Sequence, residues 1–237
     1  MEVPKQQARI AGLLYLLVAL SAPLGLLIVP SEVIVSGDAT ATAEKIRNSV
    51  SLVRAGIASE LVHQILAVFL VLALSRLFKP THEALAKQLV IFGALLSVPI
   101  VFVNVLNEVA ALTLVSDAKF LSVIPRIQLD ALAYLFVRLH EHGIIIASVF
   151  WGLWLFPFGL LVIKCGFIPK ALGVLLILAG LGYLVSSFTS LIAPSQSVWV
   201  TQFTSPLQYC ELPIILWLLI WGAKSSARAL PMPPSDA

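Results

Sequence analysis

The amino-acid sequence predicts an all-α membrane protein, a polytopic bundle of six transmembrane helices. Of the 237 residues, 59% are hydrophobic and only 11% are charged, whereas a soluble domain carries roughly 25% charged residues. A helix needs about 20 apolar residues to cross the hydrocarbon layer of a bilayer. Six such stretches are present, at about residues 9–30, 54–76, 88–112, 140–163, 171–193 and 204–223.

The first span follows two basic residues, Lys5 and Arg9, as a signal peptide would. Its apolar run is longer than the hydrophobic core of a signal peptide, so we expect an uncleaved span. The fifth and sixth spans are divided by the short polar segment 194–197, which begins with a proline. Prolines are also expected to kink four of the spans, at Pro23, Pro99, Pro157 and Pro213.

We expect residues 1–228 to form one membrane domain and the proline-rich residues 229–237 to be a disordered tail. Two of the loops are long enough to hold structure of their own. The loop at residues 30–50 predicts a short interfacial helix over about 41–49, with Thr40 as its N-cap. In the loop at 116–137, Pro125 is expected to begin an amphipathic helix that leads into the fourth span.

The distribution of basic residues predicts that both termini are cytoplasmic. With that orientation the inner side carries nine basic residues near span ends, namely Lys5, Arg9, Arg76, Lys79, Lys87, Lys164, Lys170, Lys224 and Arg228. The outer side carries six, namely Lys45, Arg47, Arg54, Lys119, Arg126 and Arg138. Basic cytoplasmic loops account for the net charge of +3, so the charge does not indicate a nucleic-acid partner. Cys165 and Cys210 would then lie on opposite sides and form no disulfide.

Polar residues within the spans gather in their outer halves. Three spans each carry an i, i+3, i+4 stripe, and these stripes are Glu60, His63 and Gln64, then Asn104, Asn107 and Glu108, then Arg138, Glu141 and His142. Glu211 lies near the start of the sixth span, and His140 is expected to point away from the stripe on the fourth. Glycines such as Gly12, Gly173 and Gly180 are expected at close contacts between helices.

The shared depth of these groups predicts a polar pocket open to the outside. A charged group facing lipid costs about 2.5–3.5 kcal/mol at mid-span, so such residues favour a common interior. We expect the pocket to bind a small ligand or ion, with the segment 138–142 at its lip. Its predicted lining is Glu60, His63, Gln64, Asn104, Asn107, Glu108, Arg138, Glu141, His142 and Glu211.

Other functions remain open for the same residues. A metal-dependent membrane enzyme would use His63 and His142, with His140 as a candidate third histidine and Glu108 or Glu211 as a ligand or base. Two histidines on different helices can also ligate haem, and titrating carboxylates and histidines suit a proton relay or transporter. The polar groups could instead form a structural network in a lipid-binding or partner-binding protein. The sequence does not choose among these, nor does it give a cofactor, a substrate or an oligomeric state.

Six segments in order carry a resemblance to a known family. They are "RIAGLLYLL" (9–17), "VPSEVIVSGDATATAEKI" (29–46), "LVRAGIASELV" (52–62), "VNVLNEVAAL" (103–112), "LHEHGIIIASVFWGLWLFPFGLLV" (139–162) and "GFIPKALGVLLILAGLGYLV" (166–185). Over about residues 8–223 the chain resembles the bacterial multi-pass proteins catalogued as domain of unknown function family 4386. The resemblance implies a protein of the bacterial inner membrane with no assigned activity, and it transfers no catalytic residues.

Overall fold

The computed structural model describes residues 5–223, and the regular structure within this range is helical throughout. Six helical segments of the described chain are long and apolar enough to cross a membrane. The predicted all-α, six-span architecture is therefore confirmed. The predicted tail at 229–237 lies outside the described residues.

Several of the spans are built from more than one helical piece. The first span comprises α1 (Lys5–Pro23), the π-helix η1 (Leu24–Ile28) and α2 (Val29–Val33), and the second is α4 (Val50–Phe78). The third comprises α5 (Glu83–Val90), the π-helix η2 (Ile91–Leu96) and α6 (Ser97–Leu114). The fourth comprises α7 (Arg126–Leu153) and α8 (Leu155–Cys165), and the fifth is α9 (Lys170–Ile192). The sixth comprises α10 (Pro194–Gln208), the 3₁₀-helix η4 (Tyr209–Glu211) and α11 (Leu212–Ile220). Two connecting loops contain α3 (Ala39–Asn48) and the 3₁₀-helix η3 (Lys119–Leu121).

Interruptions in the helices lie next to the four prolines that were expected to kink them. The π-helix η1 follows Pro23, η2 precedes Pro99, the break between α7 and α8 precedes Pro157, and η4 precedes Pro213. Proline lacks an amide hydrogen, and its ring clashes with the carbonyl four residues earlier, so regular α-helix is unfavourable in the turn before it. This accounts for the interruptions before Pro99, Pro157 and Pro213, whereas η1 contains Leu26, four residues before Pro30. The extra residue of a π-helix relieves such strain and re-aims the side chains beyond it.

Three local predictions differ from the structure. The fourth span does not start near residue 140, because the amphipathic segment after Pro125 and the span form one continuous helix, α7. The polar segment at 194–197 is not a loop but the first turn of α10, a position that suits proline. The N-cap of α3 is Asp38 rather than Thr40, since the Asp38 carboxylate accepts a hydrogen bond from the Ala41 amide at 2.9 Å.

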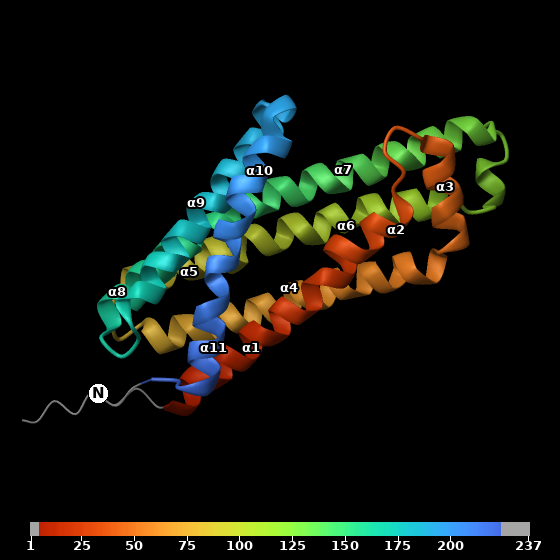
Figure 1. Cartoon of the computed structure of the whole chain (residues 1–237). Coiled ribbons are helices and arrows are strands. Elements are labelled where there is room, and N and C mark those ends of the chain that lie inside the picture. The colour runs from red at the N-terminus through yellow and green to blue at the C-terminus, as the bar shows by residue number, and fades with distance from the viewer. Residues whose placement is uncertain (1–4, 224–237) are drawn as a thin grey trace, which may run out of the picture.

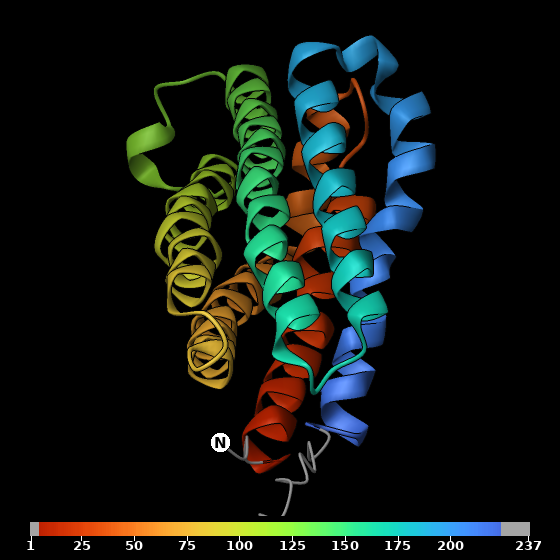
Figure 2. The same ribbon diagram turned by 90° about the vertical axis from the view of Figure 1, so that its left-hand side faces the viewer.

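The six spans form a ring in which each span packs against its neighbours in sequence (Figures 1 and 2). The sixth span closes this ring by dividing its contacts, because α10 packs on α9 whereas α11 packs on α1. The start of α1 and the end of α11 lie at the same end of the bundle as the loop between α8 and α9 (Figure 1). We call this the α8 end and the opposite one the α3 end.

Two apolar cores occupy the two ends of the bundle. The core at the α8 end includes Phe78, Trp154, Phe158 and Ile214. The smaller core at the α3 end joins α2, α3, α4, α6 and α7 through residues that include Val33, Ile46, Val53, Ala111 and Val137. Along α4, α6 and α7, buried polar side chains separate these two apolar regions. This polar layer positions the candidate site.

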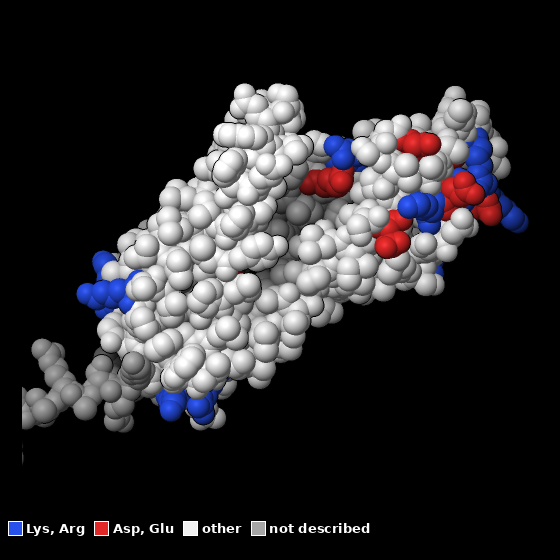
Figure 3. All heavy atoms as spheres, viewed as in Figure 1, with Lys and Arg blue, Asp and Glu red and all other residues white. Residues whose placement is uncertain are grey.

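The two ends of the molecule carry different sets of charged side chains (Figure 3). On the face shown, the α8 end carries basic groups only, and the long middle of the molecule shows almost no charge. The α3 end carries acidic and basic groups together. An acidic and a basic group also lie side by side in a hollow between the α9–α10 arm and the α3 end.

Candidate functional site

The polar layer contains a cluster of three buried titratable side chains, Glu60, Glu108 and His140, which we call the three-residue cluster. Their exposed fractions are only 2%, 7% and 5%. His140 Nε2 lies 3.1 Å from Glu60 Oε2 and 3.8 Å from Glu108 Oε2. One nitrogen or oxygen atom from each residue lies within 4.8 Å of the others, which is the spacing of a small cation site.

Each member of the cluster comes from a different helix. Glu60 lies on α4, Glu108 on α6 and His140 on α7. On α7 the imidazole continues a buried stripe that begins with Asp130, Ala133 and Val137. Steps of three and four residues keep these positions on one helix face, so His140 points into the bundle.

An asparagine fixes the α7 backbone beside the cluster. Asn104 Nδ2 donates to the carbonyl of His140 at 2.9 Å, and Asn104 Oδ1 accepts from Asn107 Nδ2 at 3.0 Å. The Asn104 amide fills the space beside Gly143, where a β-carbon would overlap it. Gly143 therefore lets α6 and α7 approach closely enough for Glu108 to face His140.

The first span forms the wall opposite the imidazole. Glu60 packs against Gly25 in the π-helix η1, and a β-carbon at Gly25 would lie 2.6 Å from Glu60 Cγ. π-helical turns occur frequently at functional sites. Here the turn brings a glycine without a side chain against a buried carboxylate.

Two carboxylate oxygens of the cluster accept no hydrogen bond within residues 5–223. Glu60 Oε1 and Glu108 Oε2 are buried and accept no hydrogen bond from any residue in the range 5–223. A buried acceptor left without a donor costs about 1–3 kcal/mol, and a charged one costs more. The arrangement is therefore suited to holding a cation or a shared proton between its two carboxylates.

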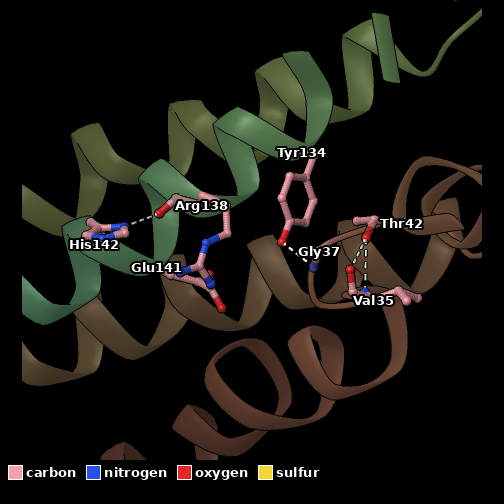
Figure 4. A network of polar contacts seen from close by, with 7 residues as sticks. All are labelled: Val35, Gly37, Thr42, Tyr134, Arg138, Glu141 and His142. Carbon is pink, nitrogen blue, oxygen red and sulfur yellow. Dashed lines mark hydrogen bonds and ion pairs between the residues drawn. The ribbon is translucent and has the colours of Figure 1, made fainter. Parts of the chain in front are cut away.

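A small cavity joins the cluster to the α3 end. It has a volume of about 30 Å³ and is lined by Glu108, His140 and Glu141 together with apolar residues of α2, α3, α4 and α6. That volume accommodates roughly two water molecules. Glu141 pairs with Arg138 on the next turn of α7 (Figure 4). The Gly37 amide donates a hydrogen bond to Tyr134 Oη at 3.0 Å, which ties α7 to the turn between α2 and α3.

The structure corrects the expectations for the histidines. His140 was expected to point elsewhere, yet it is the buried histidine of the cluster. His142 is exposed, and its Nδ1 bonds the carbonyl of Arg138 at 2.7 Å (Figure 4). His63 faces α1, where its Nδ1 lies 3.0 Å from the carbonyl of Val18. The predicted metal ligands His63, His142 and Glu108 are therefore not brought together.

The remaining predicted pocket residues divide into neighbours of the cluster and separate groups. Gln64 is buried one turn from Glu60, and Asn104 and Asn107 support His140 as described. Glu211 belongs to another site, where it accepts from Tyr15 Oη at 2.6 Å and from Tyr183 Oη at 2.9 Å. That group connects the first, fifth and sixth spans.

Two buried titratable residues, His140 and Asp130, were not predicted to face the interior of the bundle. The stripe of Arg138, Glu141 and His142 drew attention from His140, although the apolar spacing of Ala133, Val137 and Ala147 marks the buried face of α7. The buried Asp130, whose carboxylate pairs with Arg47 at 2.7 Å, lies on that same face. Hydrophobic periodicity along α7 was the signal that would have identified both.

Comparison with known proteins gives a family but no named relative. Neither the curated proteins nor the solved structures contain a significant match to this chain. The model of one family, described as a domain of unknown function, matches residues 10–222. This match covers all six spans and the three-residue cluster. The chain therefore belongs to the family described as Domain of unknown function DUF4386.

Proposed function

We propose that this protein binds a divalent transition-metal cation at the three-residue cluster. A single observation carries the proposal, namely that two buried carboxylates from separate helices face one buried imidazole. Both carboxylates keep an oxygen that accepts no hydrogen bond within the described chain. A cation between them would satisfy those oxygens and neutralise the charge.

The distances between donor atoms fit metal coordination. Nitrogen and oxygen ligands lie about 2.0–2.2 Å from Zn²⁺, so two ligands at the tetrahedral angle are about 3.3–3.6 Å apart. The two distances from His140 Nε2, 3.1 and 3.8 Å, bracket this value. Small side-chain adjustments would therefore complete a three-ligand site, leaving a fourth position toward the small cavity for water or another ligand.

The chemistry of the donors favours a transition metal over Mg²⁺ or Ca²⁺. Imidazole suits Zn²⁺ and Fe²⁺, whereas Mg²⁺ and Ca²⁺ prefer an all-oxygen shell. Binding would release protons, because the ring nitrogen facing the carboxylates must give up its hydrogen to become a ligand. We therefore expect the affinity for metal to rise with pH.

We infer that the cation enters from the outer side of the bacterial inner membrane. The basic α8 end suits the cytoplasmic face, which supports an orientation with the start of α1 and the end of α11 inside. Glu60 lies 18 residues before Phe78, the last residue of α4, or about 27 Å from the α8 end. The cluster is thus in the outer part of the roughly 30 Å hydrocarbon layer.

Equilibrium dialysis of the metal-stripped protein in detergent, with Zn²⁺ and Co²⁺ as probes, tests the proposal. We expect one ion per chain, and more than about 100-fold weaker binding in Glu60→Gln, Glu108→Gln and His140→Gln, because even an outer-shell change costs 10–100-fold. His63→Gln and His142→Gln are the matched controls and should bind normally.

Two results would overturn this function. The first is folded wild-type protein that binds no metal, which would make the cluster a proton-sharing network. The second is binding that His142→Gln or His63→Gln removes while His140→Gln retains it. Helical circular dichroism of each variant distinguishes lost binding from lost structure.

A further inference from the structure

A second cavity lies at the tip of the α3 end, away from the cluster. It has a volume of about 510 Å³ and lies between α3, the end of α6, the η3 loop and the start of α7. Ligand pockets for small molecules commonly measure 300–1,000 Å³. The charged residues that line it are Arg47, Asp117, Lys119, Arg126 and Asp130.

The charges around this cavity leave an excess of positive charge. Arg47 and Asp130 neutralise each other in the floor, where their side chains are 20% and 3% exposed. Arg126 reaches only the highly exposed Asp117, at 3.6 Å. Lys119 forms no ion pair with any residue of the described chain. The N-terminus of the 28-residue α7 also points here, and its partial positive charge adds to that of Lys119 and Arg126.

Exposed apolar side chains directly neighbour in sequence the residues that line the cavity. Phe120, Val123 and Ile127 have exposed fractions of 70%, 85% and 72%, and they alternate in sequence with Lys119 and Arg126. Leu121 and Leu129 extend the apolar surface into the cavity. Exposed apolar side chains next to lysine and arginine are typical of segments that lie in the membrane interface.

The length of the fourth span places this region at the height of the lipid headgroups. Residues Arg126–Cys165 form a 40-residue helical column, about 60 Å long at 1.5 Å per residue. The hydrocarbon layer measures about 30 Å, and about 40–45 Å with its headgroups. Even a strongly tilted column therefore carries the start of α7 out of the hydrocarbon.

We propose that this cavity binds the headgroup of an anionic phospholipid, with Lys119 and Arg126 on the phosphate and the exposed apolar residues against the acyl chains. The cavity shares no residue with the three-residue cluster, so the proposal does not depend on metal binding. The exposed apolar side chains of Phe120, Val123 and Ile127, next in sequence to lining residues, favour a lipid over a free phosphate ion, because a phosphate ion makes no apolar contacts.

Native mass spectrometry, with phosphatidylglycerol and phosphatidylcholine as probes, tests the proposal on the full chain. We expect preferential retention of phosphatidylglycerol and a loss of about 30-fold in its affinity in Lys119→Gln/Arg126→Gln, at roughly fivefold per basic residue. Lys45→Gln/Arg54→Gln removes the same charge from exposed positions at the same end and should retain the lipid.

Three results would overturn the proposal. One is equal retention of the two lipids, and another is an equal loss in the two double variants. The third is full displacement of phosphatidylglycerol by millimolar inorganic phosphate, which would assign the cavity to free anions instead. Zn²⁺ binding by Lys119→Gln/Arg126→Gln should stay normal, which separates this test from that of the cluster.

Discussion

At the scale of single residues, two histidines two positions apart have opposite environments. A helix turns about 100° per residue, so His140 and His142 point about 200° apart on α7. His140 is buried between two carboxylates, whereas His142 is exposed and bonds only its own helix backbone. Their chemistry follows from rotation of the helix rather than from residue type.

The half-buried carboxylate of Glu211 shows how the fold uses tyrosine. Glu211 accepts hydrogen bonds from Tyr15 and Tyr183, so its charge has two donors inside the bundle. Replacing Tyr15 with Phe removes one donor and leaves Glu211 Oε2 without its partner. We expect Tyr15→Phe to lower the free energy of unfolding by about 1–3 kcal/mol. Thermal and denaturant unfolding in detergent measures this.

The matched control is Tyr209→Phe. Tyr209 is 68% exposed, so the loss of its hydroxyl should change stability very little. Equal destabilisation of the two variants would show that the bond from Tyr15 to Glu211 does not hold the first and sixth spans together.

At the scale of helices, glycines set the closest approaches. Gly159 on α8 faces Gly173 on α9, and a β-carbon at Gly173 would lie 2.5 Å from the Gly159 carbonyl oxygen. One further contact, between Gly152 on α7 and Gly180 on α9, repeats the pattern seven residues away along the fourth and fifth spans. Small residues allow such backbone contact in membranes, where no hydrophobic effect drives helices together. The close-packing role predicted for Gly173 and Gly180 is confirmed.

Gly173→Ala should therefore separate α8 from α9. The added methyl meets backbone, which cannot rotate away, so we expect a loss of about 1–3 kcal/mol in stability. Val174→Ile adds a similar volume at the next position, which is 50% exposed and faces away from the bundle. A lower unfolding temperature for Gly173→Ala alone is the expected result. Unchanged unfolding of both would contradict the close contact.

The sequence predicted the secondary structure better than the rotation of each helix about its axis, which decides which side chains face the protein interior and which face lipid. The length of the apolar runs predicts six spans, and the prolines mark where they are interrupted. Rotation is harder, because lipid and protein interior are both apolar. Phe69 is 56% exposed and the adjacent Leu70 is 1% exposed, yet no simple pattern distinguishes them. Glu60 and Glu108 could be predicted at the site because carboxylates avoid lipid. Predicting His140 required knowing which face of α7 points into the bundle.

At the scale of the whole molecule, two apolar cores enclose one polar layer. The ring of six spans seals this layer from the α8 end, where the larger core lies, and leaves the small cavity toward the α3 end. For the proposed cation site, this arrangement would give access from one side of the membrane. Its direction depends on which end faces the cytoplasm.

The two free cysteines report that orientation. Cys165 ends α8 at the α8 end, whereas Cys210 lies in η4, 12 residues or about 18 Å from Gly222 at the same end. Cys210 is therefore within the sixth span and not, as the sequence predicted, on the opposite side. A membrane-impermeant maleimide should label Cys165 only in inverted membranes or opened cells, and Cys210 in neither. Mass-tag detection with Cys165→Ala as the control measures this. Labelling of Cys165 in intact spheroplasts would show that the α8 end faces outward, opposite to the proposed orientation.

The central claim is that His140, Glu60 and Glu108 hold a metal ion, and X-ray absorption of the Zn²⁺-loaded protein tests it most directly. The account predicts one imidazole nitrogen and at least two oxygens at about 2.0–2.2 Å, with no sulfur. The imidazole signal should vanish in His140→Gln and persist in His142→Gln. A sulfur ligand, two imidazoles, or an imidazole signal that survives His140→Gln would contradict the account.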